Sequence, residues 1–188
     1  MIYESLLADK LAALPPRIRD FHLDAHATVW AGTAEVHHGR NIFALLIRGL
    51  FGFPKAGENI PLKVHIHRSK RGEVWTRTFG DKTLRSSQSL NRHGKLVERF
   101  GPISVTMKLI LEGKRLYLLP QSWSCLGLPM PDFLLPSGQT YEGQQGSYYA
   151  FHVEILAPLI GHIITYKGVL TPQTLKHFAP RLNHGKRI

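Results

Sequence analysis

Two charged residues, Arg77 and Glu98, stand among large apolar neighbours, and such charges are candidates for recognising a ligand. Arg77 alternates with Trp75 and Phe79, and Glu98 follows Leu96 in the same way. Residues two apart on a β-strand share one face, so each charge would lie on an apolar face. Burying a charge alone is costly, so it needs a partner. The two residues therefore either pair inside a sheet or line a cavity, where Arg77 would bind an anionic head group and Glu98 would fix its rotamer.

Other residues that could carry chemistry give weaker signals. His65 and His67 have the spacing of a strand chelate, but the sequence points to no further ligands, so we expect both on a solvated face. The sequence has no G-x-S-x-G, H-E-x-x-H or C-x-x-C motif and no glycine-rich phosphate loop. We therefore assign no catalytic residue, no metal and no cofactor. An enzyme using Glu98 or a histidine as general base would leave no local motif and stays an alternative.

The composition fits one domain with a substantial core and a reducing environment. The chain has 188 residues, of which 43% are hydrophobic and 20% charged. Its one cysteine, Cys125, cannot form an internal disulfide. Neither a signal peptide nor a membrane-spanning helix is readable, so we expect a soluble, cytoplasmic protein.

The charge is strongly basic but dispersed. The formal net charge is +11, from 24 Lys and Arg against 13 Asp and Glu. Such a field attracts polyanions and anionic membrane surfaces. The basic residues are spread along the chain without exposed aromatic stacking pairs, which argues against a nucleic-acid partner.

The periodicity predicts a mainly β (α+β) fold with helices at the amino terminus. Residues 2–23 show helical spacing, interrupted at Pro15 and Pro16. Ten strands are expected at residues 27–37, 60–69, 73–80, 83–90, 94–100, 103–112, 114–120, 138–143, 147–156 and 162–170. Short hairpin connectors and missing crossovers favour an antiparallel meander that curls into a calycin-like barrel or half-barrel. Residues 1–170 would form this domain and residues 171–188 a short basic tail, too rich in proline and glycine for the long helix of a helix-grip fold.

Two apolar insertions interrupt the meander. Residues 42–53 are apolar on nearly all sides and are expected to be helical up to Pro54, whereas four prolines make residues 126–136 irregular. The segments would either plug the barrel ends or form the lid of a cavity, a membrane contact or a protein contact. In the membrane case Arg40, Arg48 and Lys55 would meet lipid head groups.

Several short sequence motifs between residues 2 and 170 resemble one family. They are Gly32-Thr-Ala-Glu-Val36, Trp75-Thr-Arg-Thr-Phe-Gly80, Leu96-Val-Glu-Arg-Phe-Gly-Pro102, Leu126-Gly-Leu-Pro-Met-Pro131, Pro158-Leu-Ile-Gly161 and Tyr166-Lys-Gly168. In this order they resemble the bacterial domain-of-unknown-function family 4166. The resemblance implies no activity and no catalytic residues. Members stand alone or follow reductase domains of the short-chain or saccharopine-dehydrogenase type, which implies an auxiliary role beside a reductase-like partner.

Together these patterns favour a non-enzymatic or auxiliary domain that binds a small apolar or amphipathic ligand, such as a lipid or fatty acyl group. The cavity is expected to be lined by Trp75, Arg77, Phe79, Glu98, Phe151 and Tyr166. The segments 42–53 and 126–136 would lie near its mouth. An enzyme in the same cavity, a membrane-surface or protein-interaction module and a filled barrel are the alternatives.

Overall fold

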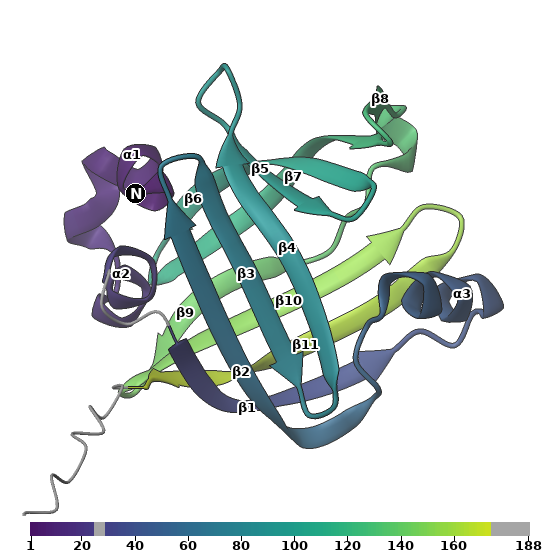
Figure 1. Ribbon diagram of the computed structural model, residues 1–188, viewed down its shortest axis with the longest axis horizontal. Coiled ribbons are helices and arrows are strands. Elements are labelled where there is room, and N and C mark those ends of the chain that lie inside the picture. The colour runs from purple at the N-terminus through teal and green to yellow at the C-terminus, as the bar shows by residue number, and fades with distance from the viewer. Residues whose placement is uncertain (25–28, 174–188) are drawn as a thin grey trace, which may run out of the picture.

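A computed structural model describes residues 1–24 and 29–173, and it contains a closed antiparallel barrel (Figure 1). Ten strands form the ring: β1 (Val29–His38), β2 (Gly57–Ser69), β3 (Gly72–Phe79), β4 (Lys82–Leu90), β5 (Leu96–Phe100), β6 (Ile103–Glu112), β7 (Arg115–Cys125), β9 (Thr140–Gln145), β10 (Tyr148–Ala157) and β11 (Gly161–Pro172). Each strand pairs with the next one in the ring, and β11 closes it against β1. The short strand β8 (Leu128–Pro129) pairs only with β7. The predicted meander and its closure into a barrel are confirmed.

Alternation decides which side chains fill the barrel. On β2, Leu62, Val64 and Ile66 are buried, whereas His65 and His67 are exposed, as predicted. The hairpins are tight, and Gly113 between β6 and β7 has a φ of 58°, which glycine adopts without strain. Closing the sheet on itself gives every strand of the ring a neighbour on both sides over at least part of its length, and it gives the apolar faces a common interior.

The amino-terminal helices close one end of the barrel, here called the capped end. They are α1 (Ile2–Leu7), a 3₁₀ turn (Ala8–Ala13) and α2 (Pro16–Leu23), with proline in the first turn of α2. Their apolar side chains Tyr3, Leu7, Ile18 and Phe21 are buried. The Phe21 ring stacks on the Tyr149 ring at a centroid distance of 3.9 Å, so α2 is packed directly onto the barrel interior.

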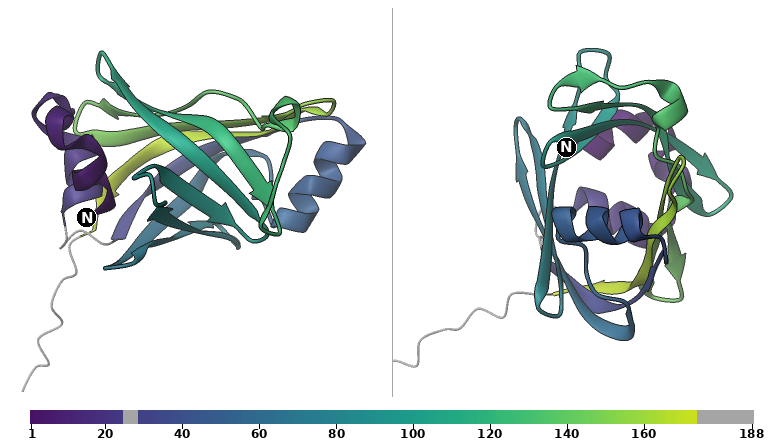
Figure 2. Two further views of the ribbon diagram at one scale, coloured as in Figure 1. Left: turned by 90° about the horizontal axis from the view of Figure 1, so that it is seen from above. Right: turned by 90° about the vertical axis from the view of Figure 1, so that its right-hand side faces the viewer.

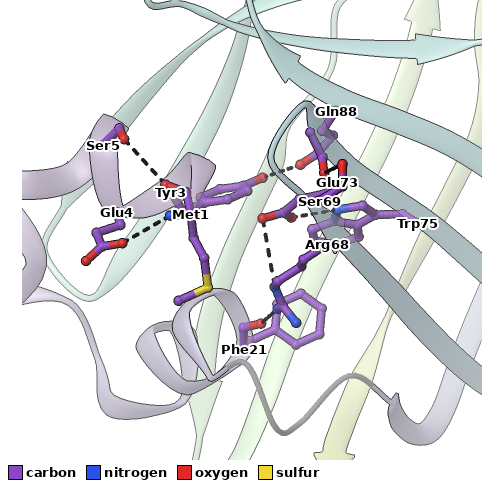
Figure 3. Close-up of polar contacts among 11 residues, drawn as sticks. Met1, Tyr3, Glu4, Ser5, Phe21, Arg68, Ser69, Glu73, Trp75 and Gln88 are labelled. Atoms are coloured by element: carbon purple, nitrogen blue, oxygen red, sulfur yellow. Dashed lines mark hydrogen bonds and ion pairs between the residues drawn. The ribbon is translucent and has the colours of Figure 1, made fainter.

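Polar contacts fix these helices to β2, β3 and β4 (Figure 3). The Tyr3 hydroxyl donates to Gln88 Oε1 over 3.0 Å, and Arg68 Nη2 donates to the carbonyl of Phe21 over 2.7 Å. Glu73 lies between them, accepting from Trp75 Nε1 at 3.1 Å and lying 3.8 Å from Arg68 Nε. These buried contacts specify how the helices sit on the barrel.

Helix α3 (Ile42–Phe51) lies across the opposite end of the barrel, as the right-hand view of Figure 2 shows. The Asn41 side chain caps its start by accepting from the amide of Phe43, and Gly52 ends it in the left-handed conformation with a φ of 63°. The buried Arg48 side chain donates to the carbonyls of Gly39 and Ile163 over 2.9 and 3.3 Å. The expectation that Arg48 meets lipid head groups is therefore wrong, because its guanidinium holds α3 against β11.

The second insertion lies at the same end as α3. Strands β7 and β9 pair only at Leu116↔Glu142 and Tyr117↔Tyr141, and then diverge. Between them the chain forms β8 and a 3₁₀ turn (Asp132–Leu134). We call this end, bounded by α3, residues 126–138 and the β10–β11 turn, the mouth. Among the described residues, no helix is long and apolar enough to cross a membrane.

Candidate functional site in the barrel interior

An apolar cavity of about 360 Å³ occupies the barrel between its middle and the mouth. Ile47, Phe51 and Phe53, from α3 and the residues after it, line the cavity at the mouth. Its walls come from β5, β6, β10, β11 and the segment after Leu134, and include Val105, Met107, Val153, Ile155, Ile160 and Ile163. Glu98 and Tyr166 bring polar atoms to this lining. Both insertions therefore line the mouth of an apolar cavity.

A smaller cavity of about 60 Å³ lies further toward the capped end. Trp75, Arg77, Phe79 and Phe151 line it. Tyr166, Thr140 and Val153 line both cavities, so these three residues form the boundary between them. The six predicted residues thus lie together in the barrel interior, five at the small cavity and Glu98 at the large one. Whether they bind a ligand stays a prediction.

Arg77 and Glu98 form a buried ion pair. Arg77 Nη2 donates to Glu98 Oε1 over 3.2 Å, and Nη1 donates to the Ser86 hydroxyl over 2.8 Å. Ser86 in turn donates to Glu98 Oε1 over 2.6 Å. The guanidinium also lies 4.9 Å from the centre of the Trp75 ring. Each charge therefore has its partner inside the protein, and the contact with Glu98 restrains the Arg77 side chain.

The electrostatics of this pair favour the charged form of Arg77. Burial alone would lower the pKa of Arg77, but the negative charge of Glu98 outweighs it and the pKa is raised. Burial raises the pKa of Tyr166 to about 12, with Arg77 opposing the shift and Glu98 adding to it. The Tyr166 hydroxyl is therefore neutral at physiological pH. Within the described residues it has no hydrogen-bond partner.

A second buried polar group, which the sequence did not reveal, lies toward the capped end. His22 Nε2 of α2 is 2.5 Å from Glu142 Oε2 of β9, and the Tyr3 ring stacks on the His22 ring at 3.6 Å. Glu142 also lines the small cavity. Burial, followed by the negative charge of Glu142, raises the pKa of Tyr149 well above its usual value. These groups join the amino-terminal helix to the inner end of the site.

The signals for the missed residues differ. Ser86 and Gln88 could have been found, because they alternate with Leu84 on β4 and all three are buried. His22 and Glu142 are 120 residues apart, and neither has a local pattern that pairs it with the other. Among the described residues, no group of three or more His, Cys, Asp or Glu side chains is placed to hold a metal ion.

A larger hollow of about 890 Å³ lies on the outer wall, over β1, β9, β10 and β11. Some of its charged groups contact one another or an aromatic ring. Lys167 Nζ is 3.0 Å from Glu35 Oε2, and the Arg115 guanidinium lies 4.4 Å from the centre of the Tyr141 ring. His152 also stacks on that ring at 5.0 Å. The hollow lies on the outer wall and its lining is largely polar, whereas the interior cavity is apolar, so the interior cavity is the stronger candidate site.

Fold and cavity together define a closed up-and-down barrel with an apolar interior cavity. The chain belongs to the family described as domain of unknown function (DUF4166), whose model matches residues 14–170. The resemblance seen in the sequence is thereby confirmed. Comparisons with curated proteins and with solved structures gave no match.

Proposed function

We propose that this protein is a binding domain that holds a small apolar or amphipathic molecule inside the barrel. The observation that carries the proposal is the cavity of about 360 Å³, lined by aliphatic and aromatic side chains and reaching the mouth. Its volume lies in the range of small-molecule sites, roughly 300–1,000 Å³. An occupant would supply the packing contacts that an empty apolar cavity lacks.

The polar groups of the cavity favour a neutral head group over an anionic one. Glu98 balances the charge of Arg77. A carboxylate ligand would therefore have to compete with Glu98 for the guanidinium, and the negative charge of Glu98 would repel that ligand. The Tyr166 hydroxyl is neutral and lacks a partner among the described residues. An alcohol, ester or amide at the inner end could exchange a hydrogen bond with it. A long-chain alcohol or its ester is therefore the ligand class that fits.

The alternative of an enzyme with Glu98 as general base has less support. Oxygen Oε1 of Glu98 already accepts hydrogen bonds from Arg77 and Ser86. A general base must reach the proton it removes, at about 2.6–3.2 Å. Holding the arginine in place is the role that these contacts support.

Native mass spectrometry of the protein purified from its own host is the first test. We expect a stoichiometric small molecule that is released on denaturation and has a neutral head group. Displacement of a fluorescent apolar probe should then rank a long-chain alcohol above the fatty acid of equal length. A clean apo mass, together with failure of every apolar probe to bind, would contradict the proposal.

Two variants locate the binding in the cavity. Ile155→Trp fills the cavity and should abolish probe binding, whereas Leu119→Trp, a partly exposed residue that does not line it, should leave binding unchanged. Tyr166→Phe should weaken alcohol binding about fivefold, since one neutral hydrogen bond contributes roughly 1 kcal/mol. Equal loss in both tryptophan variants would show that probe binding does not report on the cavity.

A further inference from the structure

The mouth is surrounded by exposed apolar side chains, here called the apolar rim. They are Ile42, Phe43, Leu45, Leu46 and Leu50 of α3, Leu126 of the β7–β8 turn, Leu128 of β8, Phe133 of the 3₁₀ turn, and Leu159 of the β10–β11 turn. Leu159 is 93% exposed, and Leu50 and Leu126 are each 80% exposed. Single exposed leucines are common, but nine large apolar residues at one end of a molecule mark an interaction surface.

Two residues of the rim lie in turns that rarely hold a leucine. Leu126 and Leu159 have φ angles of 53° and 67°, in the left-handed region that costs a residue with a side chain roughly 1 kcal/mol. Turns that need this conformation usually carry glycine, asparagine or aspartate, whereas both of these positions hold exposed leucines. Their position at the tips of two separate turns makes them suited to insert into an apolar medium.

We propose that the apolar rim docks the mouth of the barrel onto an anionic phospholipid bilayer. The cations around α3 complement such a surface: Arg40 and Lys55 flank the helix, are exposed, and have no ion pair among the described residues. The segments that form the mouth carry one exposed acid, Asp132. The net charge of +11 adds a long-range attraction to anionic lipid.

A bilayer fits the rim better than a second copy of the chain. The rim side chains project from α3, from residues 126–133 and from the β10–β11 turn, rather than from one flat face. A protein partner covering them would seal the mouth, whereas a bilayer would give an apolar ligand a path that never crosses water. This last argument rests on the proposed function; the exposure of the rim and its flanking charges do not.

Cosedimentation of the full chain with vesicles tests the docking. The vesicles would contain either phosphatidylcholine alone or phosphatidylcholine with about 30% phosphatidylglycerol, which gives the membrane a negative surface potential. The triple variant Leu50→Ser/Phe133→Ser/Leu159→Ser leaves the net charge unchanged, and all three side chains are exposed, so the fold should persist. We expect it to partition at least tenfold less onto anionic vesicles.

Matched variants separate the two contributions. Tyr148→Ser removes an exposed aromatic residue from the start of β10, away from the mouth, and should leave binding unchanged. Arg40→Gln/Lys55→Gln should reduce binding to anionic vesicles about fivefold per charge and leave the weaker binding to neutral vesicles unaltered. Thermal unfolding of every variant checks that the barrel is intact.

Three results would overturn the docking. The first is that the wild type binds neither kind of vesicle. The second is that the triple variant binds as well as the wild type. The third is that the wild type is a dimer in sedimentation equilibrium and the triple variant a monomer, which would assign the rim to a second copy. The outcome is distinguishable from that of the ligand proposal. Vesicle binding by a protein with no ligand would support docking alone, and a bound ligand without vesicle binding would support the cavity alone.

Discussion

Arg77 and Glu98 illustrate how a barrel interior holds two opposite charges. Their side chains are only 12% and 9% exposed, and Ser86 and Trp75 complete the surroundings of the guanidinium. The attraction between them offsets a large desolvation cost, so the pair adds little to stability as a unit but neither member can be removed alone without penalty. This asymmetry gives a measurable signature.

We expect Arg77→Met to lower the free energy of unfolding by about 3–5 kcal/mol, because it leaves the Glu98 carboxylate buried without its counter-ion. The double variant Arg77→Met/Glu98→Leu should regain most of that loss. Urea denaturation at neutral pH measures both. As a control, Arg17→Met breaks the half-exposed Arg17–Asp20 pair and should cost no more than about 0.5 kcal/mol. A double variant no more stable than the single one would show that the two charges are not coupled.

The buried tyrosines predict a loss of stability at alkaline pH. Burial raises the pKa of Tyr166 to about 12, and it raises those of Tyr3 and Tyr149 well above the usual value. Above about pH 10 the unfolded chain releases these protons while the folded chain retains them, so the contribution is complete below pH 10 and declines as the pH rises toward 12. Each group should cost about 1.4 kcal/mol per pH unit in this window.

Urea denaturation at pH 8, 9, 10 and 11 gives this profile. Tyr166→Phe should decline less steeply than the wild type above pH 10, and Tyr148→Phe, which alters a half-exposed ring, should decline like the wild type. Identical slopes for Tyr166→Phe and the wild type would mean that this hydroxyl titrates normally.

At the residue scale, the alternation of apolar and polar residues along the strands predicted which side chains face the barrel interior, but it did not predict contacts between distant segments. Arg77, Glu98 and Tyr166 were found because each lies on a strand whose apolar neighbours define the inner face. The contact between His22 and Glu142 depends on how α2 is placed on the closed barrel, and no local pattern encodes that placement. The burial of Arg48 was missed for a similar reason, since its partners are backbone carbonyls of Gly39 and Ile163.

At the scale of elements, strand positions were predictable and their ends were not. The expected strand 114–120 continues to Cys125, because β6 remains beside β7 as far as Ile103↔Cys125. The break at Pro15 and Pro16 was seen, but the 3₁₀ turn Ala8–Ala13 was not. The expected tail begins inside β11, which runs to Pro172; residues 174–188 lie outside the described part of the chain.

The closest approach between elements lies where β11 meets β1. A Cβ added to Gly168 would lie 2.2 Å from the carbonyl oxygen of Thr33 and 2.9 Å from the Phe151 ring. A backbone oxygen cannot move aside as a flexible side chain can. Glycine at this position therefore lets the first and last strands pair while Phe151 lies over the backbone.

We expect Gly168→Ala to lower the free energy of unfolding by about 2–3 kcal/mol, because the two strands must separate to admit the methyl group. Gly143→Ala is the matched control, since an added Cβ there meets nothing within 4 Å; its effect should stay within about 0.5 kcal/mol. Denaturation monitored by tryptophan fluorescence measures both variants. A tolerated Gly168→Ala would mean that the β1–β11 contact is looser than described.

At the scale of the whole molecule, the wall of the barrel is uneven. The β1–β11 pairing runs from Trp30↔Pro172 to His38↔Ile164, whereas β7 and β9 share only Leu116↔Glu142 and Tyr117↔Tyr141. Beyond that point the chain between the two strands contacts the barrel at separate places: Ser137 pairs with Leu156 of β10, and Trp123 of β7 donates to the carbonyl of Pro131. The wall is thus weakest beside the cavity.

Hydrogen exchange should report this unevenness. We expect those amides of Leu118–Ser122 that do not donate to β6 to exchange at least about 100-fold faster than amides of the β1–β11 pairing, because local opening there breaks fewer ladder bonds. A bound ligand should slow them. Uniformly slow exchange around the barrel would show that residues 131–138 seal the wall as firmly as a strand does.

The pairing of β1 with β11 also brings residues 29 and 173 together at one end of the barrel. The amide of Gln173 donates to the carbonyl of Val29 over 2.8 Å, and α1 and α2 lie at the same end of the barrel (Figure 1). Residue 1 and residue 173 therefore both lie toward the capped end, opposite the mouth. An affinity tag fused before residue 1 or after residue 173 would therefore be attached near the capped end, and it would leave the mouth unobstructed.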